Sequence, residues 1–345
     1  MATALSEIYR PIQPQLQAAE QLLLKELGAQ RGSHGGLLVE MTRHVAQMSG
    51  KRIRPALALL GAALAHEDAK GRNGLNGSRA LLHRAVKLAT AVEMIHTATL
   101  LHDDVIDGAS LRRGISTLNA KWGDTLSILS GDFLYSKAFC LLSELDHPPV
   151  LRLMTDTART VCEGEVAQIQ HQYDLTLTRG AYLKIIDWKT ASLMGGSAEA
   201  GALLGGASRA RAARLGVFGR SFGIAFQILD DTQDLVGDEE ALGKSLGTDL
   251  ALGQLTLPLL YLRDAADPEL RSQLAQWFNG NGSRTAVQAR EQLQRIKEEA
   301  IRLRVPAYCQ RVAGRYLLKA RQALAPFPDS PHKESLLALT EFLVQ

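Results

Sequence analysis

The sequence predicts an all-α fold, organised as a single-domain helical bundle. Apolar residues recur every three to four positions in Ala- and Leu-rich segments along most of the chain, which is the spacing of amphipathic helices. Runs of Val, Ile and Thr that alternate with polar residues between turns, as strands would require, are missing from the sequence. The breaks between helical segments are too short to be interdomain linkers.

Five segments carry the helical pattern most clearly. In chain order they are residues 15–27, 81–101, 182–194, 215–229 and 256–266. The breaks are rich in Gly, Pro, Asn and Asp, which favour turns, and lie at residues 31–36, 67–78, 146–150, 278–283 and 327–332. We expect residues 1–345 to form one domain, with residues 1–19 as a loosely ordered N-terminal extension.

Composition narrows the function classes. The chain has 345 residues, 46% of them hydrophobic and 22% charged, as in soluble globular proteins. A formal net charge of +3 is too near neutral to predict nucleic-acid binding. The sequence shows neither a signal-peptide pattern nor an apolar run of membrane-spanning length. Three cysteines (Cys140, Cys162 and Cys309) without metal-ligand spacing favour a reduced, cytoplasmic protein in which each is a small core residue.

Two aspartate clusters of identical spacing are the main chemical signal. The first cluster is Asp103, Asp104 and Asp107, and the second is Asp230, Asp231 and Asp234. Because each residue turns about 100° on a helix, the carboxylates of each cluster share one side. The first cluster lies near a helix end that Gly108 would close. Carboxylates gathered near a helix C-terminus need a cation, and Mg²⁺ suits them because it also bridges to substrate phosphates.

Other interpretations of these clusters are weaker. A solvated polar face would explain one triplet, but two of identical spacing favour facing carboxylate walls that clamp a polyanion through shared metal ions. An EF-hand would need an oxygen ligand at each alternate position and a glycine at the sixth, which the second cluster lacks. Residues 237–245 have five residues between Gly237 and Gly243, where a phosphate-binding loop has about four.

Basic groups suited to phosphate stand near both clusters. Lys51, Arg52 and Arg54 precede a helix that Pro55 would open, so three cations meet a helix N-terminus. The remaining polar candidates are Arg112, Arg113, Lys189, Thr190, Lys244 and Asp249. His96 lies seven residues before Asp103, on the same helical face. Taken alone, however, His96 is more typical of a hydrogen-bonded core residue.

These motifs together resemble those of the trans-prenyl (polyprenyl) diphosphate synthases. The segments GKRIRP, HDDVID with LRRG, GE with Gln168, KTA, FQILDDTQD and GKSLGTDLALGQLTLP occur in the order found in that family. The resemblance runs from about residue 20 to the C-terminus. It implies an isoprenoid-synthase helical bundle with a central active-site cavity, which condenses isopentenyl diphosphate onto an allylic diphosphate.

The resemblance also implies a role for each motif residue. The implied metal ligands are Asp103, Asp107, Asp230, Asp231 and Asp234, with Asp104 in support. The implied allylic diphosphate ligands are Arg112, Lys189, Thr190, Gln227 and Lys244. Isopentenyl diphosphate would meet Lys51, Arg54, His96 and Arg113. Gln254 stands where some relatives carry a second lysine.

Cofactor and partners follow from the same resemblance. It implies about three Mg²⁺ ions per active site, with Mn²⁺ as a substitute. It also implies a homodimer with at most transient membrane association. The expected product is a polyprenyl diphosphate for a quinone side chain.

Product length is expected to depend on residues before the first cluster. Short-product relatives carry a bulky aromatic four or five residues before the first aspartate, whereas this chain has Thr99 and Ala98. Helix angles direct Thr99 and Ile95 toward the aspartates better than Ala98, while the resemblance points to Ala98. Ala98 and Thr99 are both small, so either choice predicts an open tunnel and a product of about seven to ten isoprene units. Phe139 is a candidate floor residue, or an ordinary core residue.

Four alternatives stay open. A synthase of the twenty-carbon product, geranylgeranyl diphosphate, is the main one. A non-catalytic subunit of a heteromeric synthase would be expected to lose metal or diphosphate residues, and this chain keeps both clusters. A terpene cyclase would leave Lys51, Arg54 and Arg113 without a second diphosphate to bind. A helical binding module explains the motifs least well.

Overall fold

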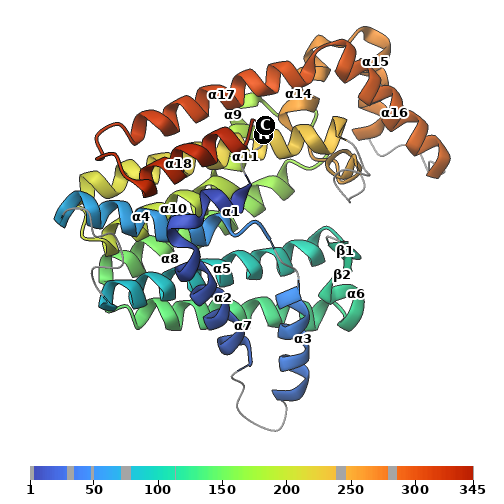
Figure 1. Ribbon diagram of the computed structural model, residues 1–345. Helices are drawn as coiled ribbons and strands as arrows, with labels where there is room; N and C mark the ends of the chain where they lie inside the picture. The colour runs from blue at the N-terminus through green and yellow to red at the C-terminus, as the bar shows by residue number, and fades with distance from the viewer. Residues whose placement is uncertain are drawn as a thin grey trace. The chain divides into compact units, whose positions relative to one another are not determined.

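The computed structural model describes residues 4–28, 35–47, 50–70, 79–112, 114–237, 246–278 and 286–344. Within these residues the regular structure is helical apart from one short β-hairpin (Figure 1). The predicted all-α class is therefore confirmed. The helical segments predicted from apolar spacing lie in helical elements of the structure, except that Thr256 and Ala266 flank the last of these helices.

The elements follow one another with short connections. The first half of the chain contains α1 (Leu5–Ile8), η1 (Arg10–Ile12), α2 (Gln13–Gly28), α3 (Gly35–Gln47), α4 (Ile53–Lys70), α5 (Arg79–Ile106), β1 (Leu111–Arg112), β2 (Ile115–Ser116), α6 (Leu118–Trp122), α7 (Asp124–Ser143) and α8 (Pro148–Gln170). The second half contains α9 (Arg179–Ile186), η3 (Asp187–Ala191), α10 (Ser192–Leu204), α11 (Arg209–Val236), α13 (Thr248–Ala251), α14 (Leu257–Ala265), α15 (Pro268–Phe278), α16 (Ala286–Arg302), α17 (Val305–Ala323) and α18 (Pro331–Phe342).

The chain divides into two compact units. Unit 1 consists of Met1–Arg159, Leu193–Arg220 and Lys319–Gln345. Unit 2 consists of Thr160–Ser192 and Ser221–Leu318. The first aspartate cluster belongs to unit 1 and the second to unit 2. That residues 1–345 act as one domain stays a prediction.

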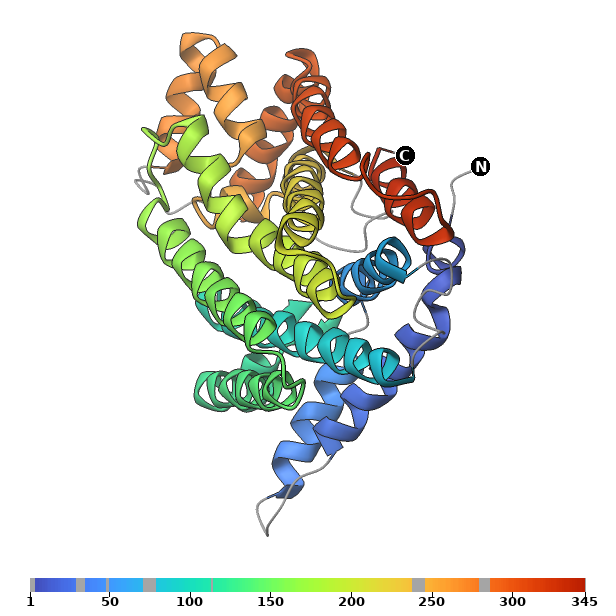
Figure 2. The same ribbon diagram turned by 90° about the vertical axis from the view of Figure 1, so that its left-hand side faces the viewer.

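Helix α5 is the central element of unit 1. It lies side by side with α7 and also packs against α2 and α4 (Figures 1 and 2). Residues 88–95 of α5 are all buried, because apolar or small side chains occupy nearly every direction around this stretch. The helix that carries the first cluster is thus held on several sides by neighbouring helices.

Glycines allow α4 and α10 to approach each other closely. A Cβ atom on Gly201 would lie 2.1 Å from the carbonyl oxygen of Ala58, and one on Gly61 would lie 2.5 Å from that of Ala198. Real Cβ atoms do not reach such distances, so any larger residue would push the helices apart. This contact supports the N-terminal half of α4, where Arg54 lies.

The N-terminal residues form part of unit 1. Residues 4–19 form α1, η1 and the first turns of α2, although the sequence predicted a loosely ordered extension. Ile8, Tyr9 and Ile12 are buried there. These apolar side chains explain why the segment packs, since their burial offsets the conformational entropy of ordering it.

Unit 2 gathers its C-terminal helices around α14. This helix packs against α9, α15 and α16. Trp277 of α15 donates a hydrogen bond from Nε1 to the carbonyl oxygen of Leu250, at 2.8 Å. Phe278 and Leu274 of the same helix are buried.

A short β-hairpin was not predicted from the sequence. Strands β1 and β2 pair antiparallel in a hairpin, with Leu111 opposite Ser116, where no strand was predicted. Two residues per strand are too few to show the alternating pattern.

Cys140 and Cys162 are exposed and only Cys309 is buried, so the prediction that all three are core residues was wrong. Among the described residues, no helix has the length and apolarity needed to cross a membrane.

Candidate active site

The first aspartate cluster occupies the C-terminal end of α5. The helix ends at Ile106, and Gly108 follows with a φ of 61°, as predicted for a helix-closing glycine. The three carboxylates are not equivalent, because Asp104 is fully buried whereas Asp103 and Asp107 are only half-buried. Asp107 directly follows α5, and its backbone N–H donates to the carbonyl oxygen of Asp103 at 2.8 Å, so these two residues stand one turn apart. These two are therefore the more exposed carboxylates of the first cluster.

Asp104 instead holds Arg112 of the hairpin. Its Oδ1 accepts hydrogen bonds from Nε of Arg112 at 2.8 Å and lies 2.7 Å from Nη2 of the same side chain. Burial raises the pKa of Asp104, and Arg112 partly opposes that shift. The ion pair fixes the guanidinium of Arg112 against Asp104, the buried member of the first cluster. Arg113 is outside the described residues.

Backbone-directed hydrogen bonds hold the hairpin in place. Asn119 donates from Nδ2 to the carbonyl oxygens of Asp104 and Ala109, at 3.2 and 3.0 Å. Thr117 donates from Oγ1 to the same carbonyl of Ala109, at 2.7 Å. Nε2 of His44 lies 2.7 Å from the carbonyl oxygen of Ser116. Arg112 thus projects from a braced loop.

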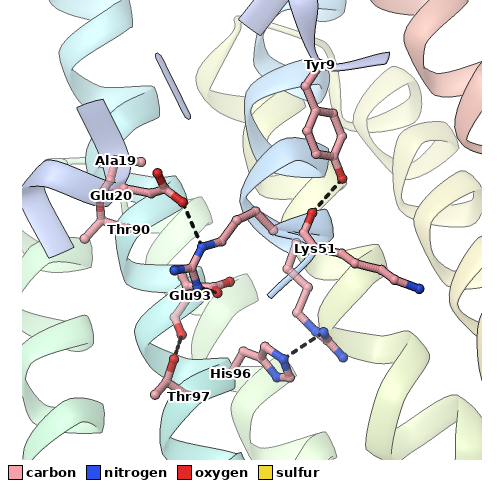
Figure 3. A network of polar contacts seen from close by, with 10 residues as sticks. Tyr9, Ala19, Glu20, Lys51, Thr90, Glu93, His96 and Thr97 are labelled. Atoms are coloured by element: carbon pink, nitrogen blue, oxygen red, sulfur yellow. Dashed lines mark hydrogen bonds and ion pairs between the residues drawn. The ribbon is translucent and has the colours of Figure 1, made fainter. Parts of the chain in front are cut away.

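Two residues predicted to bind isopentenyl diphosphate lie together in unit 1. Nη1 of Arg54, in the first turn of α4, lies 3.1 Å from Nε2 of His96 on α5 (Figure 3). Lys51 precedes α4 and is exposed, with its ammonium nitrogen 5.8 Å from the ring centre of Phe342. Helix α4 begins at Ile53, two residues before the predicted start at Pro55. Arg54 therefore lies within the first helical turn, where backbone N–H groups also favour anions.

The second cluster lies on α11 and differs from the first. Asp230 is half-buried, whereas Asp231 and Asp234 are buried. The hydroxyl of Tyr182 donates to Oδ2 of Asp231, and Nε2 of Gln227 donates to its Oδ1, each at 2.6 Å. Burial raises the pKa of Asp231 to about 7 despite these two donors.

Asp234 is also engaged by protein groups. Its Oδ1 accepts a hydrogen bond from Oγ1 of Thr248 at 2.6 Å, and its Oδ2 accepts one from the backbone N–H of Asp249 at 3.1 Å. These bonds join the end of α11 to the start of α13. Asp230 is the least buried carboxylate of this cluster, and the metal-binding roles of Asp231 and Asp234 stay predictions.

A π-helical turn positions Lys189 and Thr190. This turn, η3, interrupts the helix between α9 and α10, and such turns occur often at functional sites. Oγ1 of Thr190 donates to Oε1 of Gln227 at 2.8 Å, so a continuous row of hydrogen bonds links Thr190, Gln227, Asp231 and Tyr182. Glu165, the acidic residue of the GE motif, has its Oε2 2.5 Å from the ammonium nitrogen of Lys189. Lys244 is outside the described residues.

Gly164 lets α8 contact the π-helical turn directly. A Cβ atom at this position would lie 2.4 Å from the backbone nitrogen of Lys189 and 2.8 Å from its Cα. We expect Gly164→Ala to lower the free energy of unfolding by about 1–3 kcal/mol, because the clash is with backbone that cannot rotate away. Urea denaturation of the full chain measures this effect.

Gly180 on the neighbouring helix α9 provides the matched control. Its added Cβ would meet nothing closer than 3.8 Å. Gly180→Ala is expected to stabilise the protein by about 0.5–1 kcal/mol, because alanine restricts the unfolded chain more than glycine does. Equal denaturation midpoints for the two variants would contradict the close contact at Gly164.

The residues predicted to control product length lie in unit 1. Ile95 and Ala98 are fully buried on α5. Thr99 is half-buried, and its Oγ1 donates to the carbonyl oxygen of His96 at 2.7 Å. Phe139 is half-buried on α7 and stacks on Tyr135, with ring centres 6.4 Å apart. Their roles in product length stay predictions.

Metal binding fits these clusters only in combination with a ligand. Within the described parts of the chain, no three His, Cys, Asp or Glu side chains are arranged to hold a metal ion by themselves. Asp104, Asp231 and Asp234 face protein donors, as described above. Asp103, Asp107 and Asp230 are the half-buried carboxylates of the two clusters, and carboxylate oxygens are ligands that Mg²⁺ takes together with substrate phosphate oxygens.

Comparison with known proteins identifies the family. Residues 36–296 match the family model described as polyprenyl synthetase. The octaprenyl diphosphate synthase of Haemophilus influenzae is 34% identical over 336 residues, which are 97% of this chain and 95% of the relative. The geranylgeranyl diphosphate synthase of Methanosarcina mazei is 33% identical over 316 residues, 89% of each chain.

A solved structure agrees with this assignment. The polyprenyl synthase of Caulobacter crescentus, crystallised with calcium and isoprenyl diphosphate, superposes with a TM-score of 0.88 at 32% identity. The match covers 100% of this chain and 98% of that one. The chain therefore belongs to the polyprenyl synthetase family and is a prenyltransferase.

Proposed function

We propose that this chain condenses isopentenyl diphosphate head to tail with an allylic diphosphate, such as farnesyl or geranylgeranyl diphosphate, to give a long all-trans polyprenyl diphosphate. The observation that carries the proposal is the pair of aspartate clusters of identical spacing, each accompanied by phosphate-binding side chains. Membership of the polyprenyl synthetase family supports the reaction class. The family match includes residues of both units, which supports one functional domain.

Asp103, Asp107 and Asp230 are the carboxylates that we propose as the main ligands of Mg²⁺. They are the least buried members of the two clusters, and Mg²⁺ prefers a few carboxylates completed by phosphate oxygens. The bound ions would supply charge neutralisation on the departing diphosphate. The calcium in the Caulobacter relative supports a divalent ion. About three ions per site, and replacement by Mn²⁺, are parts of the proposal that metal titration can test.

The chain's own cations do the remaining work on the allylic diphosphate. Arg112, Lys189 and Lys244 would bind its oxygens and stabilise the charge that develops as the C–O bond breaks. Thr190 and Gln227 would complete this group. Ion pairs with Asp104 and Glu165 hold Arg112 and Lys189 in defined places before any substrate arrives, so less conformational freedom is lost on binding.

The second substrate would supply the new bond. Lys51, Arg54, His96 and Arg113 would hold the diphosphate of isopentenyl diphosphate. When the C–O bond of the allylic diphosphate breaks, an allylic carbocation forms. The double bond of isopentenyl diphosphate attacks this cation, a carbon–carbon bond forms, and a proton leaves the condensed product. We propose the released diphosphate as the proton acceptor. Apolar walls must exclude water from the cation, which fits the Ala- and Leu-rich sequence before each cluster.

We propose a product of about 35 to 50 carbon atoms, which is about seven to ten isoprene units. Ala98 and Thr99 are small, and the octaprenyl relative supports a long chain. The geranylgeranyl relative, of nearly equal identity, supports the twenty-carbon alternative. A quinone side chain, homodimeric assembly, a cytoplasmic location and transient membrane contact belong to the same proposal.

The direct experiment supplies the purified full chain with farnesyl diphosphate, isopentenyl diphosphate and Mg²⁺. The products are dephosphorylated and separated by chain length. We expect products of about seven to ten isoprene units, and none when a chelator removes the metal. A product that stops at twenty carbons would favour geranylgeranyl diphosphate synthesis. Lack of turnover by the chain alone would favour a subunit of a heteromeric enzyme.

A further inference from the structure

Arg52 stands between two residues of the isopentenyl diphosphate set, Lys51 and Arg54. Its backbone has a φ of 50°, in the left-handed region that side chains other than glycine rarely adopt. Helix α4 begins at the next residue, Ile53. The chain therefore turns sharply at Arg52, and something must hold this conformation against its intrinsic preference.

Two carboxylates from other helices hold the Arg52 side chain. Nε of Arg52 donates to Oε1 of Glu20 on α2 at 3.0 Å, and Nη1 donates to Oε1 of Glu93 on α5. The Arg52 side chain is 16% exposed and that of Glu93 is 9% exposed, while Glu20 is 46% exposed. A planar guanidinium can serve both carboxylates at once, which a lysine ammonium does less well.

The same short segment is also held from the N-terminal side. The hydroxyl of Tyr9 donates to the carbonyl oxygen of Lys51 at 3.0 Å, and Tyr9 is buried. Burial, with a smaller effect of Glu93, raises the pKa of Tyr9, so its hydroxyl remains a donor at neutral pH. Residues 51 and 52 thus contact helices α2 and α5 and the junction between α1 and η1, all in unit 1.

The placement of Glu93 connects this network to the substrate residues. Glu93 lies three residues before His96 on α5, so both side chains point to the same side of the helix. His96 contacts Arg54. In Figure 3 the ammonium group of Lys51 points away from Glu20 and Glu93. Arg52 therefore ties the backbone between Lys51 and Arg54 to Glu20 on α2 and to Glu93 on α5.

We propose that Arg52 is a positioning residue for isopentenyl diphosphate, which acts by binding Glu20 and Glu93 and thereby presents Lys51 and Arg54 to the diphosphate. The proposal rests on the proposed function of Lys51, Arg54 and His96. We expect Arg52 not to touch the ligand, because its guanidinium already binds two carboxylates of the protein, Glu20 and Glu93. Its effect should be specific to one of the two substrates.

Steady-state kinetics of Arg52→Lys and Arg52→Gln test this specificity. We expect the KM for isopentenyl diphosphate to rise about tenfold, more for glutamine than for lysine, while the KM for farnesyl diphosphate stays within about twofold. Arg52→Gln with Glu93→Gln should recover part of the loss, because the unpaired buried carboxylate is then removed. Equal changes in both KM values, or no change in either, would overturn the positioning role.

Two further variants keep the test valid if an Arg52 variant fails to fold. Glu20→Gln removes one half of the network at a half-exposed position, and we expect a smaller, still selective rise in the KM for isopentenyl diphosphate. Glu26→Gln is the matched control, since Glu26 lies on the same helix and pairs with Lys137 at 2.9 Å. We expect it to leave both KM values unchanged. Identical behaviour of the two glutamate variants would overturn the proposal.

The variant Arg54→Gln distinguishes a failure of the positioning role of Arg52 from a failure of the proposed isopentenyl diphosphate site. If Arg54→Gln raises the KM for isopentenyl diphosphate and the Arg52 variants do not, the positioning role fails while the binding site stands. If Arg54→Gln leaves that KM unchanged, the proposed isopentenyl diphosphate site is wrong, and the role of Arg52 falls with it.

Discussion

Asparagine in place of Asp103 or Asp230 is expected to lower turnover by about 10²- to 10³-fold, because each change removes one charged oxygen ligand from the group that neutralises the departing diphosphate. Asn keeps the size of the side chain, so folding should be preserved. Both residues are half-buried and lie within the last two turns of the long helices α5 and α11. The rate of product formation at saturating substrates measures the effect.

Two comparisons make this prediction specific. Asp264→Asn changes an exposed aspartate whose partner is the neighbouring Arg263, and turnover should remain at the wild-type level. Asp104→Asn should act differently from Asp103→Asn, since Asp104 holds Arg112 rather than facing a ligand. We expect it to weaken the binding of the allylic substrate as well. Turnover of Asp103→Asn close to wild type would contradict the role given to the first cluster.

Tyrosine in place of Ala98 is expected to shorten the product while condensation continues. Ala98 is fully buried on α5, five residues before Asp103. If a tunnel for the growing chain passes Ala98, the new ring occupies space that the chain would fill, and growth stops earlier. If Ala98 instead lies in ordinary close-packed core, the ring would overpack it and destabilise the protein. Product length and thermal unfolding together separate these two outcomes.

Ala89 provides the matched control for this substitution. It is also fully buried on α5, but nine residues earlier, so it faces the opposite side of the helix. We expect Ala89→Tyr to destabilise the protein strongly, since a large side chain enters packed core there. An Ala98→Tyr variant that is equally destabilised, or that makes products of unchanged length, would contradict the tunnel.

Local sequence signals predicted the elements of the fold well. Helical spacing identified α5 and α11, and Gly108 marked the end of the first cluster's helix as expected. These features depend on neighbouring residues in the chain, so the sequence contains them directly. The hairpin and the π-helical turn were not predicted, because each has contacts with residues distant in the sequence, such as His44 for the hairpin and Gly164 for the turn.

The differences within each aspartate cluster also could not be predicted. Helix geometry treats Asp230 and Asp231 as neighbours on one side, yet Asp231 is buried against Tyr182, which is 49 residues away in the sequence. Likewise, nothing local to Arg52 indicated that Glu20 and Glu93 would bind it. Residue types and spacing predict the chemistry of the site, whereas tertiary packing decides which carboxylates are buried against protein donors and which stay half-buried.

Binding of an allylic diphosphate tests most directly whether both aspartate clusters contribute to its metal-dependent capture, as we propose. A thio analogue of farnesyl diphosphate, which resists ionisation, is titrated into the full chain with and without Mg²⁺ in a calorimeter. We predict binding that requires Mg²⁺ and that is weakened by Asp103→Asn and by Asp230→Asn separately. Binding that is unaffected by one of these variants, or that persists at full strength without the metal, would contradict the proposed role of the two aspartate clusters.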